Sequence, residues 1–401
     1  MRLRFLTAGE SHGPALTGVI EGLPAGLALS QAEIDAHLKR RQGGHGRGGR
    51  MKIESDSARI LSGVRWGLTL GGPLTLQIEN RDWKNWDKGM SADAAHAGSI
   101  PPVTRPRPGH ADLPGALKYA HDDVRNVLER SSARETAMRV ALGAVCRKFL
   151  AEFGVAIGSF VVSIGSAHVN AGAMEGHSLS LLYDDAEDSP VRCPDPVASE
   201  RMVAAIDQAQ ADGDSLGGVF VVYAEGLPVG LGSHVQWDRR LDGRLAQALM
   251  SIQAIKGVEV GLGFESAVRR GSEVMDEILP PAEGSAQAVD RTRNNAGGIE
   301  GGMTNGMPVI LRAAMKPIPT LRTALRSVDM QTGEPVEAAY ERSDVCAAPA
   351  AAVIGEAMAA LVLADAFLEK FGGDSMAECT RNWRAYQDSV GEAIGRARTD
   401  Q

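Results

Sequence analysis

The stretch of this 401-residue chain that decides its fold is Glu129-Arg-Ser-Ser-Ala-Arg-Glu-Thr-Ala-Met-Arg-Val-Ala-Leu-Gly-Ala-Val145. Ser132 and Glu135 have the spacing of a capping box, and apolar residues then recur at helical intervals. These two patterns predict a helix over residues 132–151. Its N-terminal amides, together with neighbouring hydroxyl and guanidinium groups, form a seat for an anion, made by Arg130, Ser131, Ser132 and Arg134. An ordinary capped helix with surface arginines is the alternative interpretation.

A stiff loop precedes this helix and presents charged side chains. It consists of Arg105-Pro-Arg-Pro-Gly-His-Ala-Asp112, whose two prolines fix the backbone. Arg107, His110 and Asp112 are therefore expected to stay close together. A histidine in such a loop can transfer protons near neutral pH, although taken singly it is more often a structural hydrogen-bonding residue. The same two interpretations apply to His12 in an earlier glycine-bearing loop.

The composition is that of a soluble globular protein. Hydrophobic residues make up 44% of the sequence and charged residues 23%, so a packed core and a polar surface can both form. No segment has the uninterrupted apolar length that a membrane span needs, and the N-terminus has too short an apolar run for a signal peptide. We therefore expect a cytoplasmic protein without a membrane partner. The four cysteines are widely separated, which argues against a metal site or a disulfide framework.

Charge is distributed unevenly along the chain. The net charge of −8 argues against a nucleic-acid partner. Between residues 38 and 53, however, there is no acid among the basic residues Lys39, Arg40, Arg41, Arg47, Arg50 and Lys52. This contrast predicts a small polyanionic ligand. A disordered Arg/Gly tract that binds RNA is a weaker alternative, since such tracts are longer and repeated.

Hydrophobic patterns elsewhere predict strands interleaved with helices. Strands are expected within residues 1–29, as an antiparallel pair within 59–80, and at 155–164, 219–224 and 258–264. Helices are expected from Ser30 to Arg41 and at 199–211, 240–255 and 346–371, with a long loop at 81–103. An α+β fold is favoured over a doubly wound parallel one. One domain over residues 1–375 would be followed by a polar tail at 376–401.

Two short motifs match catalytic fingerprints but fail in their structural context. Gly9-Glu-Ser-His-Gly13 has the pattern of a hydrolase nucleophile elbow, yet a strand rather than a helix is expected after it. Gly44-His-Gly-Arg-Gly-Gly49 has the pattern of a dinucleotide site, yet it follows a helix. What remains is a set of glycine-rich loops whose amides and basic side chains favour an anion, at 9–13, 43–50, 105–112, 297–306 and 316–320.

Several of these stretches together resemble the chorismate synthases. Three of them are similar to family signatures: Gly9-Glu-Ser-His-Gly-Pro-Ala-Leu-Thr-Gly-Val-Ile-Glu-Gly-Leu-Pro24, Arg130-Ser-Ser-Ala-Arg-Glu-Thr-Ala-Met-Arg-Val140 and Arg342-Ser-Asp-Val-Cys-Ala-Ala-Pro-Ala350. Four further runs are similar to other characteristic parts of the family, at 41–51, 107–112, 251–257 and 297–306. The resemblance extends from about residue 4 to about residue 371, in the expected order.

The resemblance implies a single-domain β-α-β sandwich, with two antiparallel sheets around a helical layer, assembled as a homotetramer. It implies a lyase that converts 5-enolpyruvylshikimate 3-phosphate to chorismate and phosphate by 1,4-elimination, the last step of the shikimate pathway to aromatic amino acids. Reduced FMN would be the cofactor, and both NADPH and an external flavin reductase are compatible with the motifs as sources of electrons. A non-catalytic protein that binds a flavin or a phosphate ligand is the alternative from another class.

The resemblance also implies roles for single residues. His12 would protonate the departing phosphate, His110 would support the protonated reduced flavin, and Asp344 would act with flavin N5 in taking the substrate proton. FMN would be bound by Arg130, Ser131, Ser132, Gln253, Ala254, Gly301, Lys316, Pro317, Ile318, Pro319, Thr320 and Arg342. Substrate anions would meet Arg41, Arg50, Arg107 and Arg134, while Arg41 and Arg47 match positions associated with NADPH. No metal is implied, and Asn294 and Asn295 depart from the family pattern, so no role is carried over to them.

Overall fold

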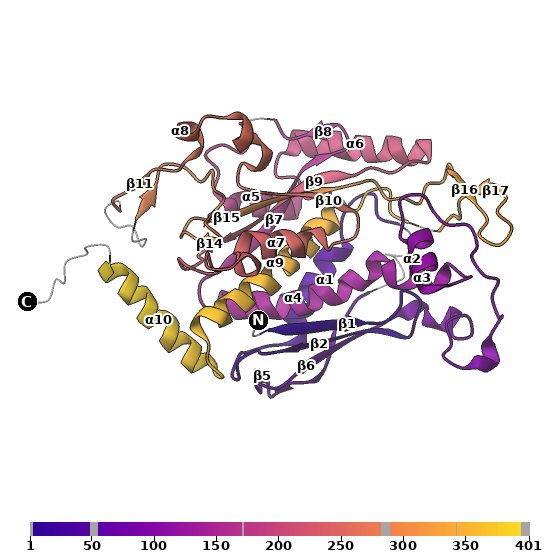
Figure 1. Ribbon diagram of the computed structural model, residues 1–401, viewed down its shortest axis with the longest axis horizontal. Helices are drawn as coiled ribbons and strands as arrows, with labels where there is room; N and C mark the ends of the chain where they lie inside the picture. Colours follow the sequence, from indigo (N-terminus) through magenta and orange to yellow (C-terminus); the bar gives the residue numbers. More distant parts are fainter. Residues whose placement is uncertain (1–2, 49–54, 171, 282–288, 342, 394–401) are drawn as a thin grey trace, which may run out of the picture.

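The computed structural model describes residues 3–48, 55–170, 172–281, 289–341 and 343–393. Two antiparallel sheets lie on either side of a layer of helices (Figure 1). The first sheet has the order β1 (Arg4–Ala8), β2 (Ala15–Glu21), β6 (Leu74–Glu79), β3 (Arg59–Ser62). The second has the order β10 (Ile255–Val260), β15 (Val309–Met315), β9 (Gly218–Glu225), β7 (Ala156–Ile164), β8 (Ala167–His168). The α+β class expected from the sequence is confirmed.

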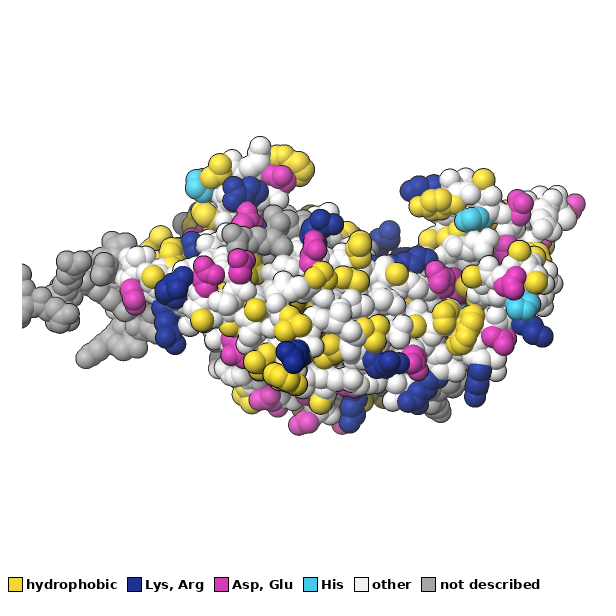
Figure 2. All heavy atoms as spheres, turned by 90° about the horizontal axis from the view of Figure 1, so that it is seen from below, with side chains coloured by type: hydrophobic (Ala, Val, Ile, Leu, Met, Phe, Trp, Pro, Cys, Tyr) yellow, Lys and Arg dark blue, Asp and Glu magenta, His cyan; other side chains and the backbone are white. Residues whose placement is uncertain are grey.

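Alternating side chains explain how the first sheet packs. In β6, Leu74, Leu76 and Ile78 are buried, whereas Thr75 and Gln77 between them are only partly buried. Since successive side chains of a strand point to opposite faces, β6 turns one apolar row toward the helices. Both β2 and β3 pair with it in antiparallel register, which confirms the predicted antiparallel pair. On the outer side of this sheet, hydrophobic side chains are interspersed with charged ones (Figure 2).

Helices α4 (Thr136–Ala151) and α9 (Ala348–Phe371) form the centre of the helical layer. They pack on each other, and α4 covers β2 and β6 while α9 covers β7 and β9. Their crossing is close, because a Cβ placed on Gly143 would lie 2.4 Å from the Cβ of Ala357. Only glycine fits at this point of α4. The layer also contains α1 (Gln31–Gln42) and α7 (Leu241–Met250), which pack against α9.

Helix α9 is apolar on all sides because it is surrounded by protein. It is long and apolar enough to cross a membrane by length and composition alone, although Glu356 and Asp365 interrupt its apolar run. However, 94% of its most apolar window is buried inside the fold. It also carries two buried carboxylates, Glu356 and Asp365, which form ion pairs with arginines. These features are typical of a core helix.

A second helical layer covers the outer face of the second sheet. It consists of α5 (Leu179–Asp188) and α6 (Pro196–Asp212), which pack on β7 and β8. Leu182 and Ala186 of α5 meet Phe160, Val221 and Tyr223 of the sheet in a small apolar cluster. This sheet is therefore buried on both faces, which explains why β7 and β9 each contain five consecutive buried residues rather than an alternating pattern.

The helix start predicted at residue 132 is wrong by one turn. A separate helix, α3 (Arg125–Ser131), comes first, Ala133–Glu135 then form a 3-10 turn, and α4 follows from Thr136. The predicted capping box is absent, because the Glu135 carboxylate binds Thr7 and Arg139 instead of the backbone. By contrast, the capping box predicted at Ser30 is present in α1.

Two other predicted boundaries differ from the structure. The helix expected to reach residue 255 is α7, which ends at Met250, and the strand expected over 258–264 is β10, which ends at Val260. In the C-terminal segment, Met376–Ala393 form helix α10, which the prediction of a polar tail did not include. Trp383 packs against Phe153 with ring centroids 5.6 Å apart, so α10 is fastened to the main core.

The remaining described elements are short. The strands are β4 (Val64–Arg65), β5 (Leu68–Thr69), β11 (Ile278–Leu279), β12 (Asp290–Arg291), β13 (Ile299–Glu300), β14 (Met303–Thr304), β16 (Arg326–Val328) and β17 (Pro335–Glu337). The helices are α2 (Asp112–Tyr119) and α8 (Gly271–Val274), with 3-10 turns η2 (Arg81–Asn85), η3 (Ala94–His96), η4 (Ala133–Glu135), η5 (Trp237–Arg239) and η6 (Gly263–Val268). Apart from η2 and η3, residues 81–103 form the expected long loop.

A buried ion cluster joins the helical layer to α5. The Glu356 carboxylate accepts hydrogen bonds from Arg40 at 2.7 Å, from Arg147 at 2.5 Å and from the Ser159 hydroxyl at 2.6 Å. Burial alone would raise the pKa of Glu356, but the neighbouring arginines outweigh it and lower this pKa to about 2. Beside the cluster, Arg40 donates to Nδ1 of His37 at 3.2 Å. Burial and the charges of Arg147 and Arg40 lower the pKa of His37 to about 4.

The neutral His37 predicts a loss of stability in mild acid. Between pH 6.5 and about 4 the unfolded chain binds a proton at His37 and the folded chain does not, so the free energy of unfolding falls as pH is lowered. At pH 5 this group should contribute a loss on the order of 2 kcal/mol relative to pH 7.5. Urea unfolding at both pH values should show a smaller loss in His37→Gln. The exposed His177→Gln is the control and should match the wild type; equal losses in all three proteins would contradict the expectation.

Candidate active site

The loop between β1 and β2 carries His12 and is held from two sides. On one side, the Ser11 N–H donates to the carbonyl of Glu129 at 3.0 Å. On the other, the Asn80 side-chain amide donates to the carbonyls of Glu10 at 3.2 Å and Gly13 at 2.7 Å. This double attachment fixes the backbone around His12 against both α3 and the end of β6.

The His12 side chain lies against a carboxylate and an indole. Its Nδ1 is 2.8 Å from Oε1 of Glu129, and its backbone N–H donates to Oε2 of the same carboxylate at 2.7 Å. The imidazole and Trp86 rings have centroids 4.3 Å apart. Burial would raise the pKa of Glu129, but the contacts with His12 and then the charge of Arg125 lower it. The Glu129 carboxylate is therefore ionised and bound to His12 in the folded chain.

His110 forms a second histidine–carboxylate pair. Its Nδ1 is 2.5 Å from Oδ1 of Asp112, and Arg107 donates to Oδ2 from its Nε at 2.8 Å. Burial opposes ionisation of Asp112, but the hydrogen bonds from His110 and Arg107 prevail and its pKa is lowered. The prediction that Arg107, His110 and Asp112 stay together is confirmed. Arg107 also donates to the Thr320 hydroxyl at 3.1 Å, which joins this loop to residues 316–320.

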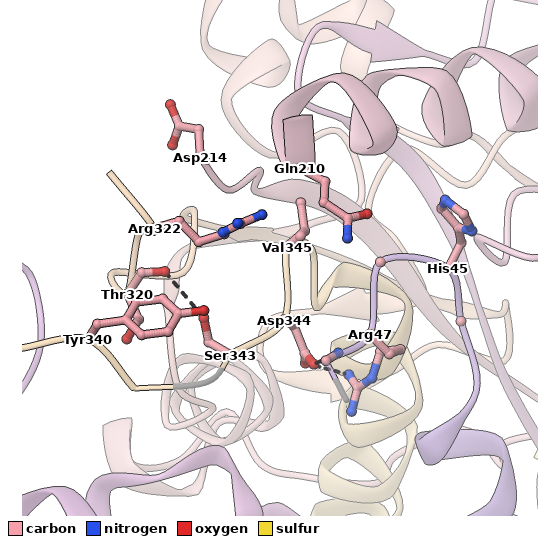
Figure 3. A pocket seen from close by; sticks show the side chains of 13 residues that line it. His45, Arg47, Gln210, Asp214, Thr320, Arg322, Tyr340, Ser343, Asp344 and Val345 are labelled. Atoms are coloured by element: carbon pink, nitrogen blue, oxygen red, sulfur yellow. Dashed lines mark hydrogen bonds and ion pairs between the residues drawn. The ribbon is translucent and has the colours of Figure 1, made fainter. Parts of the chain in front are cut away.

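Asp344 joins the basic loop at residues 43–48 to the start of α9. Its carboxylate accepts the Gly48 N–H at 2.7 Å and lies 3.1 Å from a guanidinium nitrogen of Arg47. The contact is close, since a Cβ on Gly48 would lie 2.9 Å from the carbonyl oxygen of Ser343. The pair forms part of the wall of a pocket of about 980 Å³. Figure 3 shows Arg47 and Asp344 on one side of this pocket, with Arg322 and Gln210 projecting toward the same space.

Arg41 and Arg134 lie inside the protein around the buried Asp56. Arg134 is 2.6 Å from Oδ1 of Asp56 and donates to Oδ1 of Asn80 at 3.0 Å. Arg41 donates to the carbonyl of Ala133 at 2.8 Å and lies 3.7 Å from Oδ2 of Asp56. Burial lowers the pKa of Arg41 to about 10, although Asp56 opposes the shift, so Arg41 is charged at neutral pH. The interpretation of Arg134 as a surface arginine is wrong, because it is 5% exposed.

Candidate cofactor residues meet near the start of α4. Arg130 is 43% exposed at its side chain and donates to the carbonyls of Thr7 at 2.7 Å and Gly9 at 3.1 Å. The Ser131 hydroxyl is 3.5 Å from the carbonyl of Leu128, and that of Ser132 accepts the Arg134 N–H at 3.3 Å. Arg130 is therefore attached to β1 and to the loop that carries His12, and Ser131 and Ser132 follow it directly in the chain.

Gln253 and Ala254 connect this region to residues 316–320. The Gln253 amide nitrogen is 3.5 Å from the Glu135 carboxylate, while its Oε1 is buried with no hydrogen-bond partner in the described part of the chain. Ala254 has a left-handed backbone with φ of 67°, and its carbonyl accepts the Lys316 N–H at 2.9 Å. Burial and the nearby Lys256 lower the pKa of Lys316.

Most of the other candidate residues fall into the same region, with three exceptions. Pro317, Ile318 and Pro319 continue from Lys316 to Thr320, and the Ile318 carbonyl accepts the Ser215 hydroxyl at 2.6 Å. Gly301 lies in the turn between β13 and β14, at the other end of the molecule from α2 and α3 (Figure 1). A single chain does not bring it to the other candidates. Arg50 and Arg342 lie outside the described residues.

Three residues of this site were not selected from the sequence. Glu129 could have been suspected, because it directly precedes Arg130 and the two serines. Trp86 was visible only as an aromatic residue in a long loop. Asp56 carried no signal, since its partner Arg134 is 78 positions away. Within the described ranges, no group of three His, Cys, Asp or Glu side chains is placed to hold a metal ion.

Comparison with known proteins identifies the family. The sequence model of chorismate synthase matches residues 3–368. The chain belongs to the chorismate synthase family. The chorismate synthases of Geobacter sulfurreducens and Aquifex aeolicus are 60% and 58% identical to it, over 97% of this chain and 99% and 98% of theirs. A crystal structure of a chorismate synthase, 49% identical, superposes with a TM-score of 0.79 over 98% of this chain and 99% of its own. The expectation of an enzyme of this family is thereby confirmed.

Replacing Asp56 tests the buried arginine pair. Asp56→Asn leaves Arg41 and Arg134 buried without their common counter-charge, which should lower the free energy of unfolding by about 3–5 kcal/mol. Urea unfolding followed by circular dichroism measures the loss. Glu79→Gln, which breaks the exposed pair with Arg59, is the matched control and should change stability by less than about 0.5 kcal/mol. Equal stabilities of the two variants would show that Asp56 does not hold the arginines.

Proposed function

We propose that the chain converts 5-enolpyruvylshikimate 3-phosphate to chorismate and phosphate by 1,4-elimination, with reduced FMN as cofactor. The observation that carries the proposal is the presence of two histidines, His12 and His110, each bound to a buried carboxylate. An arginine lies beside each pair, Arg125 at Glu129 and Arg107 at Asp112, in a chain of this family. The arrangement provides proton-transferring groups and cations, which is what loss of a phosphate and a ring proton needs.

The residues present fit a flavin phosphate cofactor. Lys316 is a partly buried cation that forms no ion pair with any described acid, and its ammonium group lies 3.4 Å from the Pro317 carbonyl oxygen. The orphaned Oε1 of Gln253 is a buried acceptor that a ring N–H could satisfy. Arg130 and the hydroxyls of Ser131 and Ser132 suit a phosphate. When bound, reduced FMN supplies an electron-rich ring that can lend an electron to the substrate and recover it, without net redox change.

The substrate would be held through its anionic groups. Its two carboxylates and one phosphate match the concentration of arginines at Arg41, Arg47, Arg107 and Arg134. Each of these guanidinium groups lies near a carboxylate, Asp56, Asp112 or Asp344, which fixes its orientation before the substrate arrives. Such preorganised cations stabilise the negative charge that develops on the departing phosphate.

Proton transfer is assigned to the two ends of the site. His12 would donate a proton to the leaving phosphate oxygen, which makes phosphate a better leaving group. Asp344 would accept the proton lost from the substrate ring, with Arg47 stabilising its ionised form. His110, fixed by Asp112, would bind the reduced cofactor by hydrogen bonding. Each role uses a side chain whose position another residue determines.

Replacing either histidine should lower the rate without preventing FMN binding. His12→Ala and His110→Ala are expected to retain FMN binding in fluorescence titrations but to lose kcat by roughly 10²- to 10⁴-fold, because general acid–base groups contribute that much. The exposed His168→Ala is the control and should keep the wild-type kcat. A His12→Ala variant with full kcat at every pH would return His12 to a structural role.

The stoichiometry of the flavin tests the proposed reaction. Substrate and product are at the same oxidation level, so reduced FMN should be required but not consumed. In sealed anaerobic cuvettes with photoreduced FMN, released phosphate should greatly exceed the flavin, which should remain reduced. A parallel sample with oxidised FMN and NADPH tells whether the chain reduces its own flavin.

Three results would overturn the proposed reaction. Phosphate release without a reductant would indicate a hydrolase. Release of only one equivalent of phosphate per reduced flavin would indicate a dehydrogenase. If no phosphate is released, the chain would be a binding protein.

A further inference from the structure

Glu129 has no part in the chemistry proposed above, although it touches His12 with both carboxylate oxygens. Oε1 is 2.8 Å from Nδ1 of the ring, and Oε2 accepts the His12 backbone N–H at 2.7 Å. The side chain of Glu129 is 1% exposed, so water does not compete for these bonds. A single carboxylate therefore fixes both the backbone of His12 and the rotation of its ring.

This contact also selects the nitrogen that exchanges a proton. The Glu129 carboxylate can only accept hydrogen bonds, since its pKa is lowered in the folded chain. Nδ1 must therefore carry a proton to bind it. A proton given to a leaving phosphate would then come from Nε2, and Nδ1–H would stay on Glu129 throughout.

Arg125 and Trp86 close the arrangement. Arg125 donates to Oε1 of Glu129 at 3.1 Å and lies over the Trp86 ring at 4.8 Å. Trp86 in turn lies against the His12 ring, with centroids 4.3 Å apart. The four side chains come from three segments, namely the β1–β2 loop, the end of η2, and α3. His12 is thus held at one edge by a carboxylate and on one face by an indole.

We propose that Glu129 is the positioning residue for His12: it orients the imidazole and fixes its proton on Nδ1, so that Nε2 serves as the donor to the leaving phosphate. Trp86 keeps the ring in this plane, and Arg125 keeps Glu129 ionised and in place. The catalytic part of this inference rests on the proposed function. The contact itself, and the protonation of Nδ1 that follows from it, do not.

Glu129→Gln tests the positioning role in turnover. Glutamine keeps the shape, but its amide nitrogen cannot accept a hydrogen bond, so one of the two bonds to His12 is lost. We expect kcat to fall roughly 10- to 100-fold, a part of what the general acid contributes, with KM changed less than about 3-fold. Glu129→Asp, which keeps the charge, should recover part of kcat, and the alkaline limb of the pH profile should change in Glu129→Gln but not in Glu129→Asp.

Glu341→Gln is the matched control. Among the described residues Glu341 binds Arg125 at 3.3 Å, as Glu129 does, but it does not bind His12. This variant should keep kcat within about 3-fold of the wild type, because the general acid is not disturbed. An equal loss of kcat in Glu341→Gln and Glu129→Gln would overturn the proposal. The rate would then depend on the negative charge around Arg125 rather than on the contact between Glu129 and His12.

A spectroscopic measurement separates this inference from the proposed function. Nitrogen NMR of histidine-labelled protein, with the His12 signals identified by their absence in His12→Gln, reports which ring nitrogen carries the proton. In the neutral ring of the wild type, Nδ1 should be protonated, and the two tautomers should become mixed in Glu129→Gln. If the wild type does not turn over its substrate, the proposed function fails while this result still decides the contact. A wild-type ring protonated on Nε2 alone, or an unchanged spectrum in Glu129→Gln, would overturn the inference even in an active enzyme.

Discussion

The candidate site depends on the buried ion pair between Asp56 and Arg134. Asp56 holds Arg134, Arg134 holds Asn80, and the Asn80 amide holds the carbonyls on either side of His12. An uncompensated charge inside a protein costs several kcal/mol, so none of these groups can move alone. The position of His12, whose side chain is 15% exposed, is thus set by an ion pair in the interior. Because Arg134 lies in η4, which directly precedes α4, the same chain of bonds connects the site to the central helix.

The same kind of acid–base pair occurs three times in the site. Glu129 with His12, Asp112 with His110, and Asp344 with Arg47 each join an acid to a group that can hold a proton or a positive charge. In the first two pairs burial opposes ionisation of the acid, but the hydrogen bonds it accepts prevail. The acids consequently remain charged and act as fixed acceptors. The negative charges of Asp112 and Asp344 therefore lie beside the arginines, where they orient them.

Local patterns in the sequence were sufficient for the class of fold and for most elements. Three patterns could be recognised because each depends only on residues that are close in sequence. They are the alternation of apolar and polar residues in β6, the capping box at Ser30 and the apolar run of α9. The missed features are long-range. Glu135 has the spacing of a capping residue, but its carboxylate binds Thr7 and Arg139 instead of the backbone. Asp56 binds Arg134, which is far away in the sequence. Helix α10 was missed because its few apolar contacts, such as Trp383 on Phe153, lie within a polar composition.

The site lies at the boundary between a large core and a small one. The main core contains α4 and α9, whereas Ala116, Val124 and Leu128 form a separate cluster under α2 and α3, with Met330 packed against it. Helix α3 belongs to the small cluster and carries Glu129 and Arg130, which hold the His12 loop.

His110 lies in the loop that leads into α2, so both histidines are attached to the small cluster, and the His12 loop is also fastened to the main core through Asn80. A cluster with few buried residues opens at a lower free-energy cost than a large core. Opening on the side of α2 would therefore loosen His110 and the contact of Glu129 with His12 together, while the packing of α4 on α9 and the hold of Asn80 on the His12 loop stay intact.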